Sequence, residues 1–558
     1  MNGPAPLEPT ASARGSNVVG VSLEDYFHVG AFRSLVEQRQ WRRFESRLAA
    51  STGAALDLLD EVGATATFFT LGWVAEHMPE LVREVAARGH EIANAGFSHQ
   101  GVATLDRSAL AEELARGHDV IAQATGLAPL GTRIPDFVRP RDRWALEVIA
   151  EAGYAYDASF RPLGTDHVPA PLARVPFSLR HGPHTLRVFP VPTLRVGPLL
   201  VPVGGGAWLR QLPGPIVSHG IERWEQTTHD PFALYFQVWE LDLEQPRITA
   251  ASRLARLRHY RHLDRMAARL RGVMQSRHFS SYAAHLGLAP QPVAPRAPVA
   301  PVPRSVTVTT ARTPVTVVVP CFNEAEALPF LRNTLESVQR ELASEYTLSF
   351  VFVDDGSTDA TWSALEALAA DRPNVQIVRH PGNRGIARAI LTGISAAKTE
   401  LVCSIDADCT YDPHQLASIL PPLVRGAALV TASPYHPRGV VRHVPAWRLV
   451  LSRTLSRMYA LGLGTSLHTY TSCFRGYRRS AFVDLQVEHG GFLGIAEMLA
   501  RTVRAGRAVE EVPATLEVRL LGTSKLKVLR VIWGHLRLLS SMHRWPEASA
   551  ITPNAGTP

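Results

Sequence analysis

Two aspartates one residue apart, Asp406 and Asp408, follow a short apolar run at 400–403 that predicts a buried strand. Carboxylates at the carboxyl end of a parallel strand face the cleft above the sheet, where they can bind a divalent cation that in turn binds a diphosphate. Taken alone, an Asp-x-Asp sequence is more often an ordinary acidic turn than a metal site. The pair therefore indicates a metal site only if neighbouring strands also end in polar residues.

Three earlier apolar runs in the C-terminal half do end in this way. In chain order they are 315–320 with Asn323 and Glu324, 349–353 with Asp354 and Asp355, and 375–379 with Asn383 and Gly385. Helical periodicity between the runs, as at 325–342, predicts a β-α-β-α-β-α-β succession and hence a doubly wound, Rossmann-like sheet. Neither a dinucleotide-binding nor a P-loop glycine motif is present in the sequence. The pattern indicates a site built from carboxylates.

The N-terminal half has its own alternation of strands and helices. Apolar strands are predicted at 17–21, 64–71 and 90–94, with helices near 41–62 and 80–88 between them. This order favours a parallel sheet, either open or closed into a barrel, with function at the strand C-termini. A stretch rich in proline and alanine at 289–314 predicts an extended linker. We therefore expect domains at 17–288 and 315–540, with disordered ends at 1–16 and 541–558.

The bulk composition limits the partners and the compartment. In 558 residues, 58 basic and 50 acidic side chains give a net charge of +8, which suits an anionic substrate or an anionic membrane surface. No basic stripe with interleaved aromatic residues predicts nucleic-acid binding, and no apolar run is long enough to span a membrane. Four cysteines, without a Cys-x-x-Cys pair, are predicted to be reduced and buried. We expect a cytoplasmic protein, or one at the inner face of the cytoplasmic membrane.

The four C-terminal motifs together resemble the family-2 glycosyltransferases with the GT-A fold, over about residues 315–525. Within that family the chain is most similar to the dolichol- or polyprenyl-phosphate hexose synthases. Those enzymes also carry two later segments, which are matched here by Tyr-Thr-Ser-Cys-Phe-Arg-Gly-Tyr-Arg-Arg at 470–479 and by Arg-Leu-Leu-Gly-Thr-Ser-Lys at 519–525. The resemblance implies that a hexose moves, with inversion, from a nucleotide sugar to a polyprenyl phosphate or a lipid-linked glycan.

The same resemblance implies roles for individual residues. Asp406 and Asp408 would bind Mg or Mn, and Arg519 and Lys525 would meet the acceptor phosphate. Glu497 would act as a base if the acceptor were a hydroxyl group. The donor-binding residues implied are Pro320, Asn323, Glu324, Asp354, Asp355, Asn383, Gly385, Arg475 and Ser524.

Several of these predicted roles have alternatives. Asn323 and Glu324 could instead cap the following helix, and Ser524 and Lys525 could belong to an ordinary loop. The segment 528–539 is either an interfacial membrane helix or a final helix packed on the sheet.

The N-terminal half resembles the polysaccharide deacetylase domain over about residues 17–285, and most of all the subgroup associated with bacterial exopolysaccharide loci. The resemblance lies in Glu24 to His28, the segments 89–94 and 98–99, Gly131 to Pro135, Trp239 to Asp242, and the regions 189–191 and 204–206. This family uses a carboxylate base, a metal held by a second carboxylate and two histidines, and a later histidine as acid.

Here Glu24 and Asp25 match the carboxylates and His99 matches one metal histidine. Ala95 and Gln237 stand where the other two histidines are expected, and neither side chain can bind zinc or deliver a proton as imidazolium does. The resemblance implies a distorted (β/α) barrel of the polysaccharide deacetylase type, and we expect it to lack a zinc-type metal and catalysis. Arg133 and Asp25 would remain as a buried pair or as saccharide contacts. A bifunctional enzyme and a glycan-binding or scaffolding module remain as alternatives.

Overall fold

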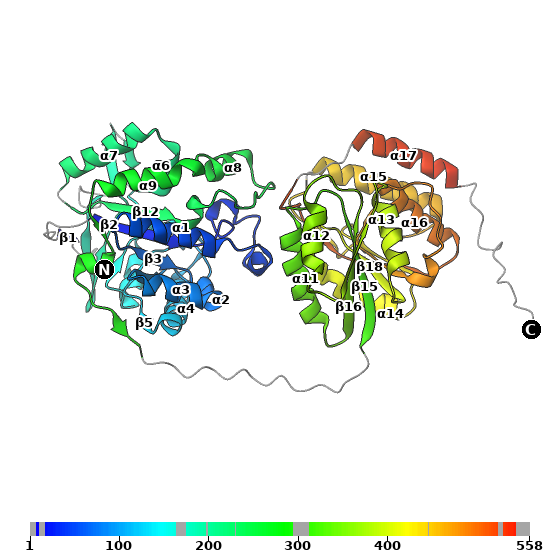
Figure 1. The fold of residues 1–558 in the computed structure, drawn as a ribbon, viewed down its shortest axis with the longest axis horizontal. Coiled ribbons are helices and arrows are strands. Elements are labelled where there is room, and N and C mark those ends of the chain that lie inside the picture. Colours follow the sequence, from blue (N-terminus) through cyan, green and yellow to red (C-terminus); the bar gives the residue numbers. More distant parts are fainter. Residues whose placement is uncertain are drawn as a thin grey trace, which may run out of the picture. The chain divides into compact units, whose positions relative to one another are not determined.

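The structure is a computed structural model that describes residues 7–9, 17–162, 174–196, 199–228, 230–293, 312–444, 446–522 and 528–542. The chain divides into two compact units, each with its own sheet (Figure 1). Unit 1 comprises Met1–Trp41, Ser46–Gln245 and Ala251–Val302, and unit 2 comprises Arg42–Glu45, Pro246–Ala250 and Pro303–Pro558.

Unit 1 contains, within its described residues, a ten-stranded sheet in the order β1-β8-β9-β7-β6-β4-β3-β2-β12, with β13 also paired to β2. The strands from β9 to β12 in this order run parallel. Their bounds are β1 Leu7–Pro9, β2 Asn17–Leu23, β3 Thr67–Thr70, β4 Glu91–Asn94, β6 Gly131–Thr132, β7 Tyr156–Asp157, β8 Phe177–His181, β9 His184–Val188, β12 Ala233–Gln237 and β13 Phe279–Ser280.

Helices pack around this sheet because the central strands are apolar on both faces; β3, for example, is buried throughout its length. The helices are α1 Leu48–Glu61, α2 Gly72–His77, α3 Pro79–Ala87, α4 Arg107–Thr125, α5 Trp144–Glu151, α6 Gly206–Gln211, α7 Gly214–Thr227, α8 Arg253–Tyr260, α9 Met266–Gln275 and α10 Tyr282–Leu286. Two small sheets pair β10 Thr193–Val196 with β11 Leu199–Pro202, and β5 Leu127–Ala128 with β14 Gln291–Pro292.

Unit 2 contains a seven-stranded mixed sheet in the order β17-β16-β15-β18-β21-β19-β22. The strands are β15 Thr313–Cys321, β16 Tyr346–Asp354, β17 Val375–Arg379, β18 Leu401–Ser404, β19 Leu429–Ser433, β21 Arg475–Arg478 and β22 Val509–Pro513. Strand β21 runs antiparallel to both of its neighbours. A small pair joins β20 Val440–Val441 to β23 Thr515–Leu516.

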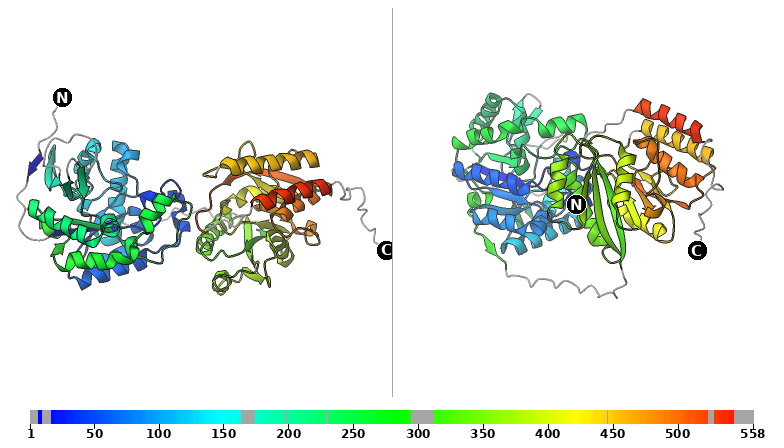
Figure 2. Two further views of the ribbon diagram at one scale, coloured as in Figure 1. Left: turned by 90° about the horizontal axis from the view of Figure 1, so that it is seen from above. Right: turned by 45° about the vertical axis from the view of Figure 1, so that its right-hand side comes forward.

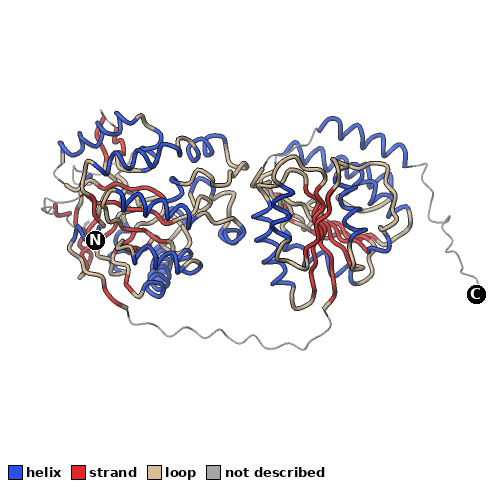
Figure 3. Tube along the Cα trace, in the orientation of Figure 1, coloured by secondary structure: helices blue, strands red, loops and turns tan. Residues whose placement is uncertain are grey.

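Helices cover both faces of the unit 2 sheet, with α11 and α12 on one side and α13 and α16 on the other (Figures 1 and 3). The helices are α11 Leu328–Leu342, α12 Thr361–Ala369, α13 Ile386–Ala396, α14 Leu416–Val424, α15 Ala446–Leu463, α16 Phe492–Arg504 and α17 Val528–Ser541. The predicted α/β fold class is confirmed for both units. Within the described residues, the unit 1 sheet is open in the manner of a half-barrel and does not close into a full barrel, and the unit 2 sheet is mixed and layered between helices.

Several local predictions can be compared with the structure. All four cysteines are buried and unpaired, as predicted. The predicted disordered N-terminus contains strand β1, which pairs with β8 at the edge of the large sheet. The predicted linker contains strand β14, which forms a two-stranded sheet with β5. The predicted helix at 41–62 is a 3-10 turn, Gln38–Arg43, followed by α1. The predicted disordered tail beyond Met542 lies outside the described residues.

Helices α15 and α17 of unit 2 pack against each other and lie side by side (Figure 2). Large apolar side chains on α15 and α17 are exposed: Trp447, Val450, Leu451, Met458, Leu461, Trp533 and Leu536. In the part of the chain that the structure describes, no helix is long and apolar enough to cross a membrane.

Candidate active site

A cavity of about 440 Å³ opens at the carboxyl ends of β15, β16 and β18 in unit 2. The register explains why polar residues converge there. Cys321 pairs with Asp354 and Val318 with Ser404, so the segments that follow these strands leave the sheet at one edge. The predicted site residues that line the cavity are Pro320, Glu324, Asp355, Asn383, Gly385, Asp406, Asp408 and Arg519.

One guanidinium faces three carboxylates at this cavity. Arg519 donates through Nη2 to Glu324 Oε2, and its Nη1 lies 3.4 Å from Asp408 Oδ2. The Nε of Arg519 donates to the carbonyl of Leu521 at 2.7 Å, which fixes the direction of the side chain. Glu324 and Arg519 are 195 residues apart in the sequence and meet only through the fold.

Asp406 completes this acidic cluster. Burial, together with the negative charges of Asp408 and Glu324, raises the pKa of Asp406 above its ordinary value, and the charge of Arg519 opposes this shift. Such crowding of carboxylates is unfavourable unless a cation joins them. The donor set suits Mg or Mn, because these hard cations prefer oxygen ligands and commonly use only one or two protein carboxylates together with substrate phosphates. The described residues contain no group of three or more acidic, His or Cys side chains placed to hold an ion by themselves.

Asp355 shapes the opposite wall of the cavity. Its Oδ1 accepts hydrogen bonds from the backbone N–H of Arg384 and lies 2.7 Å from His380 Nδ1, while its Oδ2 accepts from Gly385 N–H. Gly385 has φ of +90°, and a Cβ there would lie 2.5 Å from the backbone of Gly490. The carboxylate therefore holds the loop that carries Asn383 against the start of α16.

Two predicted donor-binding residues, Asn323 and Asp354, hold loops beside the cavity without lining it. Asn323 uses its Oδ1 to accept from Thr358 N–H at 2.7 Å, which ties the loop after β15 to the loop after β16. Asp354 is fully buried; its Oδ1 accepts from Ser357 N–H, and its Oδ2 lies 3.1 Å from Arg379 Nε. Both residues support the loops of the site instead of facing the cavity.

Arg475 and Glu497, also predicted to act at the site, are placed elsewhere. Arg475 is fully buried, and its two Nη atoms donate to the carbonyls of Tyr470 and Ile495 at 2.7 Å. Glu497 is fully buried as well and accepts from Glu488 N–H, His489 N–H and Arg501 Nε. The positions of Arg475 and Glu497 do not support the predicted donor-binding role of Arg475 or the predicted base role of Glu497, because these partners already engage both side chains.

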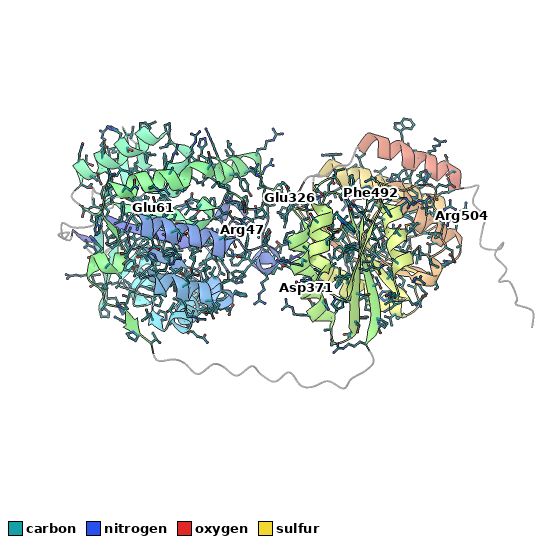
Figure 4. All side chains as sticks on the ribbon, in the orientation of Figure 1. Arg47, Glu61, Glu326, Asp371, Phe492 and Arg504 are labelled. Atoms are coloured by element: carbon teal, nitrogen blue, oxygen red, sulfur yellow. The ribbon has the colours of Figure 1, made fainter. Side chains whose placement is uncertain are left out.

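The predicted residues Ser524 and Lys525 lie outside the described residues. Sequence reasoning also missed cavity residues that carry no charge, namely Phe322, Ile386, Ala389, Gly491 and Phe492. Phe492, labelled in Figure 4, begins α16. The available signal was the Gly490-Gly491 pair just before it, since adjacent glycines allow the close backbone approach that Gly385 makes.

Unit 1 has its own cavity, of about 610 Å³, lined by Glu24, His99, Ala95, Arg133 and Gln237 among others. His99 Nε2 lies 2.6 Å from Glu24 Oε2, so these two predicted site residues do meet. Ala95 and Gln237 border the same space and supply neither an imidazole nor a carboxylate.

Asp25 does not belong to this set and does not line the cavity. It accepts from Ser46 Oγ at 2.6 Å and from the N–H groups of Tyr26 and Arg47, and its burial raises its pKa to about 7. Arg133 lies over the ring of Tyr235, whereas Asp25 is held by Ser46, Tyr26 and Arg47, so the two residues do not form the predicted buried pair. Their alternative role as saccharide contacts stays a prediction.

Comparison with known proteins decides the family of the chain. Residues 316–485 match the family described as glycosyl transferase family 2. A polyprenol monophosphomannose synthase from Mycolicibacterium smegmatis is 32% identical over 217 residues, which are 38% of this chain and 80% of that protein. An undecaprenyl-phosphate mannosyltransferase from Micrococcus luteus is 30% identical over 215 residues, 38% of this chain and 86% of that protein. The chain belongs to glycosyl transferase family 2.

The stretch that matches family 2 contains most of the cavity residues, from Pro320 to Asp408, whereas Arg519 and Phe492 lie beyond it. Among solved structures, the chain is similar to glucosyl-3-phosphoglycerate synthase from Mycobacterium tuberculosis, in complex with Mn²⁺, UDP-glucose and phosphoglyceric acid. The identity is 20%, the TM-score is 0.33, and the match covers 43% of this chain and 82% of that one.

The N-terminal part of this family 2 protein matches two further families. Residues 41–156 match the polysaccharide deacetylase family, and residues 158–286 match a domain of unknown function (DUF3473). The deacetylase resemblance of the N-terminal half is thus supported as well.

Proposed function

We propose that unit 2 transfers a hexose, with inversion and with the help of Mg or Mn, from a nucleotide sugar to a polyprenyl phosphate or a lipid-linked glycan in cell-surface polysaccharide or glycolipid synthesis. The observation that carries the proposal is the convergence of Asp406, Asp408 and Glu324 on Arg519 at the edge of the sheet. The names of the two family 2 relatives support a polyprenyl phosphate as the acceptor.

In this proposal Asp406 and Asp408 hold the divalent cation. The bound ion would neutralise the diphosphate of the donor, so that the nucleoside diphosphate leaves as a stabilised anion. Pro320, Asp355 and Asn383 form the wall of the cavity against which the nucleotide part of the donor would lie. The loop of Asn383 is kept in position by the carboxylate of Asp355.

The acceptor phosphate would be oriented by Arg519. Its guanidinium is mostly buried and contacts Glu324 and Asp408, so it lies within reach of both the metal ligands and an incoming anion. A lipid phosphate is ionised near neutral pH and can attack the sugar without a protein base, whereas a sugar hydroxyl needs one. The position of Glu497, buried and fully hydrogen-bonded, therefore favours the phosphate acceptor.

Lipid acceptors require access to a membrane, and helix α15 offers a surface for it. Trp447, Val450, Met458 and Leu461 are exposed on α15 at helical spacing, next to the arginines at 453 and 457. The helix contains no acidic residue, and exposed apolar side chains beside cations are typical of interfacial helices that bind anionic lipids. We propose peripheral attachment of unit 2 to the cytoplasmic face of the membrane through α15 and α17.

We further propose that unit 1 has lost deacetylation. Its cavity joins Glu24 to His99 but provides Ala95 and Gln237 where a metal ligand and an acid are needed. The competing candidate is a bifunctional enzyme with an altered metal site. Zinc content of the full chain and acetate release from an acetylated oligosaccharide separate the two, since stoichiometric zinc with turnover would establish the bifunctional enzyme.

The metal anchor can be tested with Asp408→Ala. Incubation with a panel of nucleotide sugars and Mn should show donor hydrolysis and transfer by the wild type and neither by the variant, with an unchanged circular dichroism spectrum. An active Asp408→Ala variant would place the site elsewhere.

A further inference from the structure

The cavity of unit 1 is lined by five arginines. They are Arg133, Arg139, Arg161, Arg210 and Arg258. Four carboxylates also border the cavity, but the numbers alone do not decide its charge, because it matters which groups are already paired.

The acidic side chains of the cavity are occupied. Glu24 pairs with His99, Asp136 lies 2.5 Å from Arg33 Nη1, and Glu240 pairs with Arg210 at 2.7 Å. The fourth, Asp142, lies 3.8 Å from Arg141. Among the described residues, none of these acids lies within ion-pair distance of the remaining cavity arginines, Arg133, Arg139, Arg161 and Arg258. Arg133 also interacts electrostatically with the buried carboxyl of Asp157, but burial raises the pKa of that carboxyl to about 7, so it compensates the arginine only in part. The cavity therefore presents an excess of positive charge.

Arg133 is the central member of this group. Its side chain borders the cavity, yet the residue is only 7% exposed, so bulk water reaches little of it. The guanidinium carbon lies 4.0 Å from the centre of the Tyr235 ring and 5.1 Å from that of Phe137. No hydrogen bond joins the guanidinium to any residue that the structure describes. Its nitrogen atoms are not among the buried unpaired atoms of the described residues, so they face the cavity, where an anion can reach their five donors.

Arg161 approaches the same place from the segment after β7. It is half-buried, borders the cavity, and its guanidinium carbon lies 5.5 Å from the Phe137 ring. Arg133 and Arg161 thus share one aromatic neighbour and can face a single acidic group between them. Arg139 and Arg258 are exposed at the rim, where they would attract an anion without binding it tightly.

Aromatic rings supply the second half of a saccharide site. Trp208, Trp239 and Tyr235 line the cavity. The ring of Tyr235 lies against Arg133 and that of Trp239 stacks on His259, so Trp208 is the ring best placed to pack against the C–H face of a sugar. The volume of about 610 Å³ lies within the range of small-molecule sites. A cavity with paired acids, free arginines and aromatic walls suits a sugar that carries a negative charge.

We propose that the cavity of unit 1 is a binding site for an anionic saccharide, with its carboxylate or phosphate held by Arg133 and Arg161. The space that a deacetylase would give to a metal is bordered here by Ala95, and the recognition is electrostatic instead. This site is separate from the donor cavity of unit 2, and its existence does not depend on the transferase proposal.

The first test uses the wild-type full chain and three ligands in isothermal titration calorimetry. Trigalacturonate carries carboxylates, its fully methyl-esterified form is the neutral match, and glucose 1-phosphate carries a phosphate. We expect saturable binding of trigalacturonate or glucose 1-phosphate, which identifies the acidic group. If trigalacturonate binds, the ester should bind at least about tenfold more weakly. Equal affinity for ester and acid, or saturable binding of none of the three, would overturn the proposal.

The second test locates the site. Arg161→Gln should weaken binding of the same anionic ligand by roughly tenfold or more, because one charge-assisted contact is lost. Arg133→Gln should do the same if its melting temperature shows that it folds. Arg195→Gln is the matched control, since it removes one exposed arginine of unit 1 that does not line the cavity. Equal losses in Arg161→Gln and Arg195→Gln would show that the cavity is not the binding site.

Discussion

Replacing Asp406 by asparagine should stabilise the metal-free protein while removing its activity. Glu324, Asp406 and Asp408 face one guanidinium, so the fully ionised cluster with Arg519 has a charge of −3 + 1 = −2. Burial and the two neighbouring carboxylates raise the pKa of Asp406, which means that folding disfavours its ionised form. Asparagine keeps the shape and removes the charge, and so relieves this cost.

The size of the effect follows from the linkage between pKa and stability. One pKa unit corresponds to about 1.4 kcal/mol, and we expect Asp406→Asn to raise the free energy of unfolding by about 1–3 kcal/mol at pH 7.5 in EDTA. For a unit of about 200 residues this is roughly 2–10 °C in Tm, measurable by differential scanning calorimetry. Asp371→Asn is the matched control, because Asp371 is an exposed acid of unit 2 (Figure 4) and its loss should change stability by no more than about 0.5 kcal/mol.

Addition of Mn should reverse the order of the two proteins. The wild type gains stability in proportion to the logarithm of metal concentration, whereas Asp406→Asn has lost one ligand and should gain little. A variant that is less stable than the wild type in EDTA would refute the electrostatic reasoning. An equal rise in Tm with Mn for both proteins would refute the assignment of Asp406 as a ligand.

Three further predictions concern His535 of α17, the glycine at position 385 and the exposed face of α15. His535 is buried, its Nδ1 lies 2.8 Å from the Tyr459 hydroxyl, and burial lowers its pKa to about 4. Because folding favours the neutral form of His535, the free energy of unfolding should be full above pH 6.5 and should fall by about 2–3 kcal/mol as the pH drops toward 4. Urea titrations of His535→Gln should show a weaker dependence of this free energy on pH. Gly385→Ala should lower the free energy of unfolding by at least about 2 kcal/mol and close the donor cavity. Gly382→Ala is the control: a Cβ there meets nothing within 4 Å, so this variant should be nearly neutral in the same urea titrations. Similar effects of the two substitutions would contradict the steric argument. Leu461→Glu, on the exposed face of α15, should reduce cosedimentation of the protein with phosphatidylglycerol vesicles roughly tenfold. Val424→Glu on α14 is the control and should not reduce it. Unchanged vesicle binding by Leu461→Glu would exclude α15 from the membrane contact.

The sequence allowed good prediction of the elements whose periodicity is strong. The buried strands β15, β16 and β18 are continuous apolar runs, and a polar residue directly after such a run marks the functional edge of a parallel sheet. This is why Asp355, Asp406 and Asp408 were found together. Short strands such as β14 and β1 have no such signal, because each is only two or three residues long and forms by pairing with one partner strand, β5 or β8.

Side-chain direction was harder to predict than backbone position. Arg475 and Glu497 lie in conspicuous motifs, yet their charges are used inside the fold by backbone carbonyls and N–H groups. Arg161 is the opposite case, a residue that lies in no motif but borders a cavity. Only the fold brings it beside Arg133 and Phe137. A sequence shows which groups exist, but tertiary partners decide which of them remain available to a ligand.

The most direct test of the central claim is to follow a labelled hexose from a nucleotide sugar in the presence of Mn and polyprenyl phosphate. We predict that the label enters the organic phase as a polyprenyl-phosphate hexose with inverted anomeric configuration, and that this product is absent with Asp408→Ala. Label that stays in water, or that is transferred equally well by Asp408→Ala, would contradict the account.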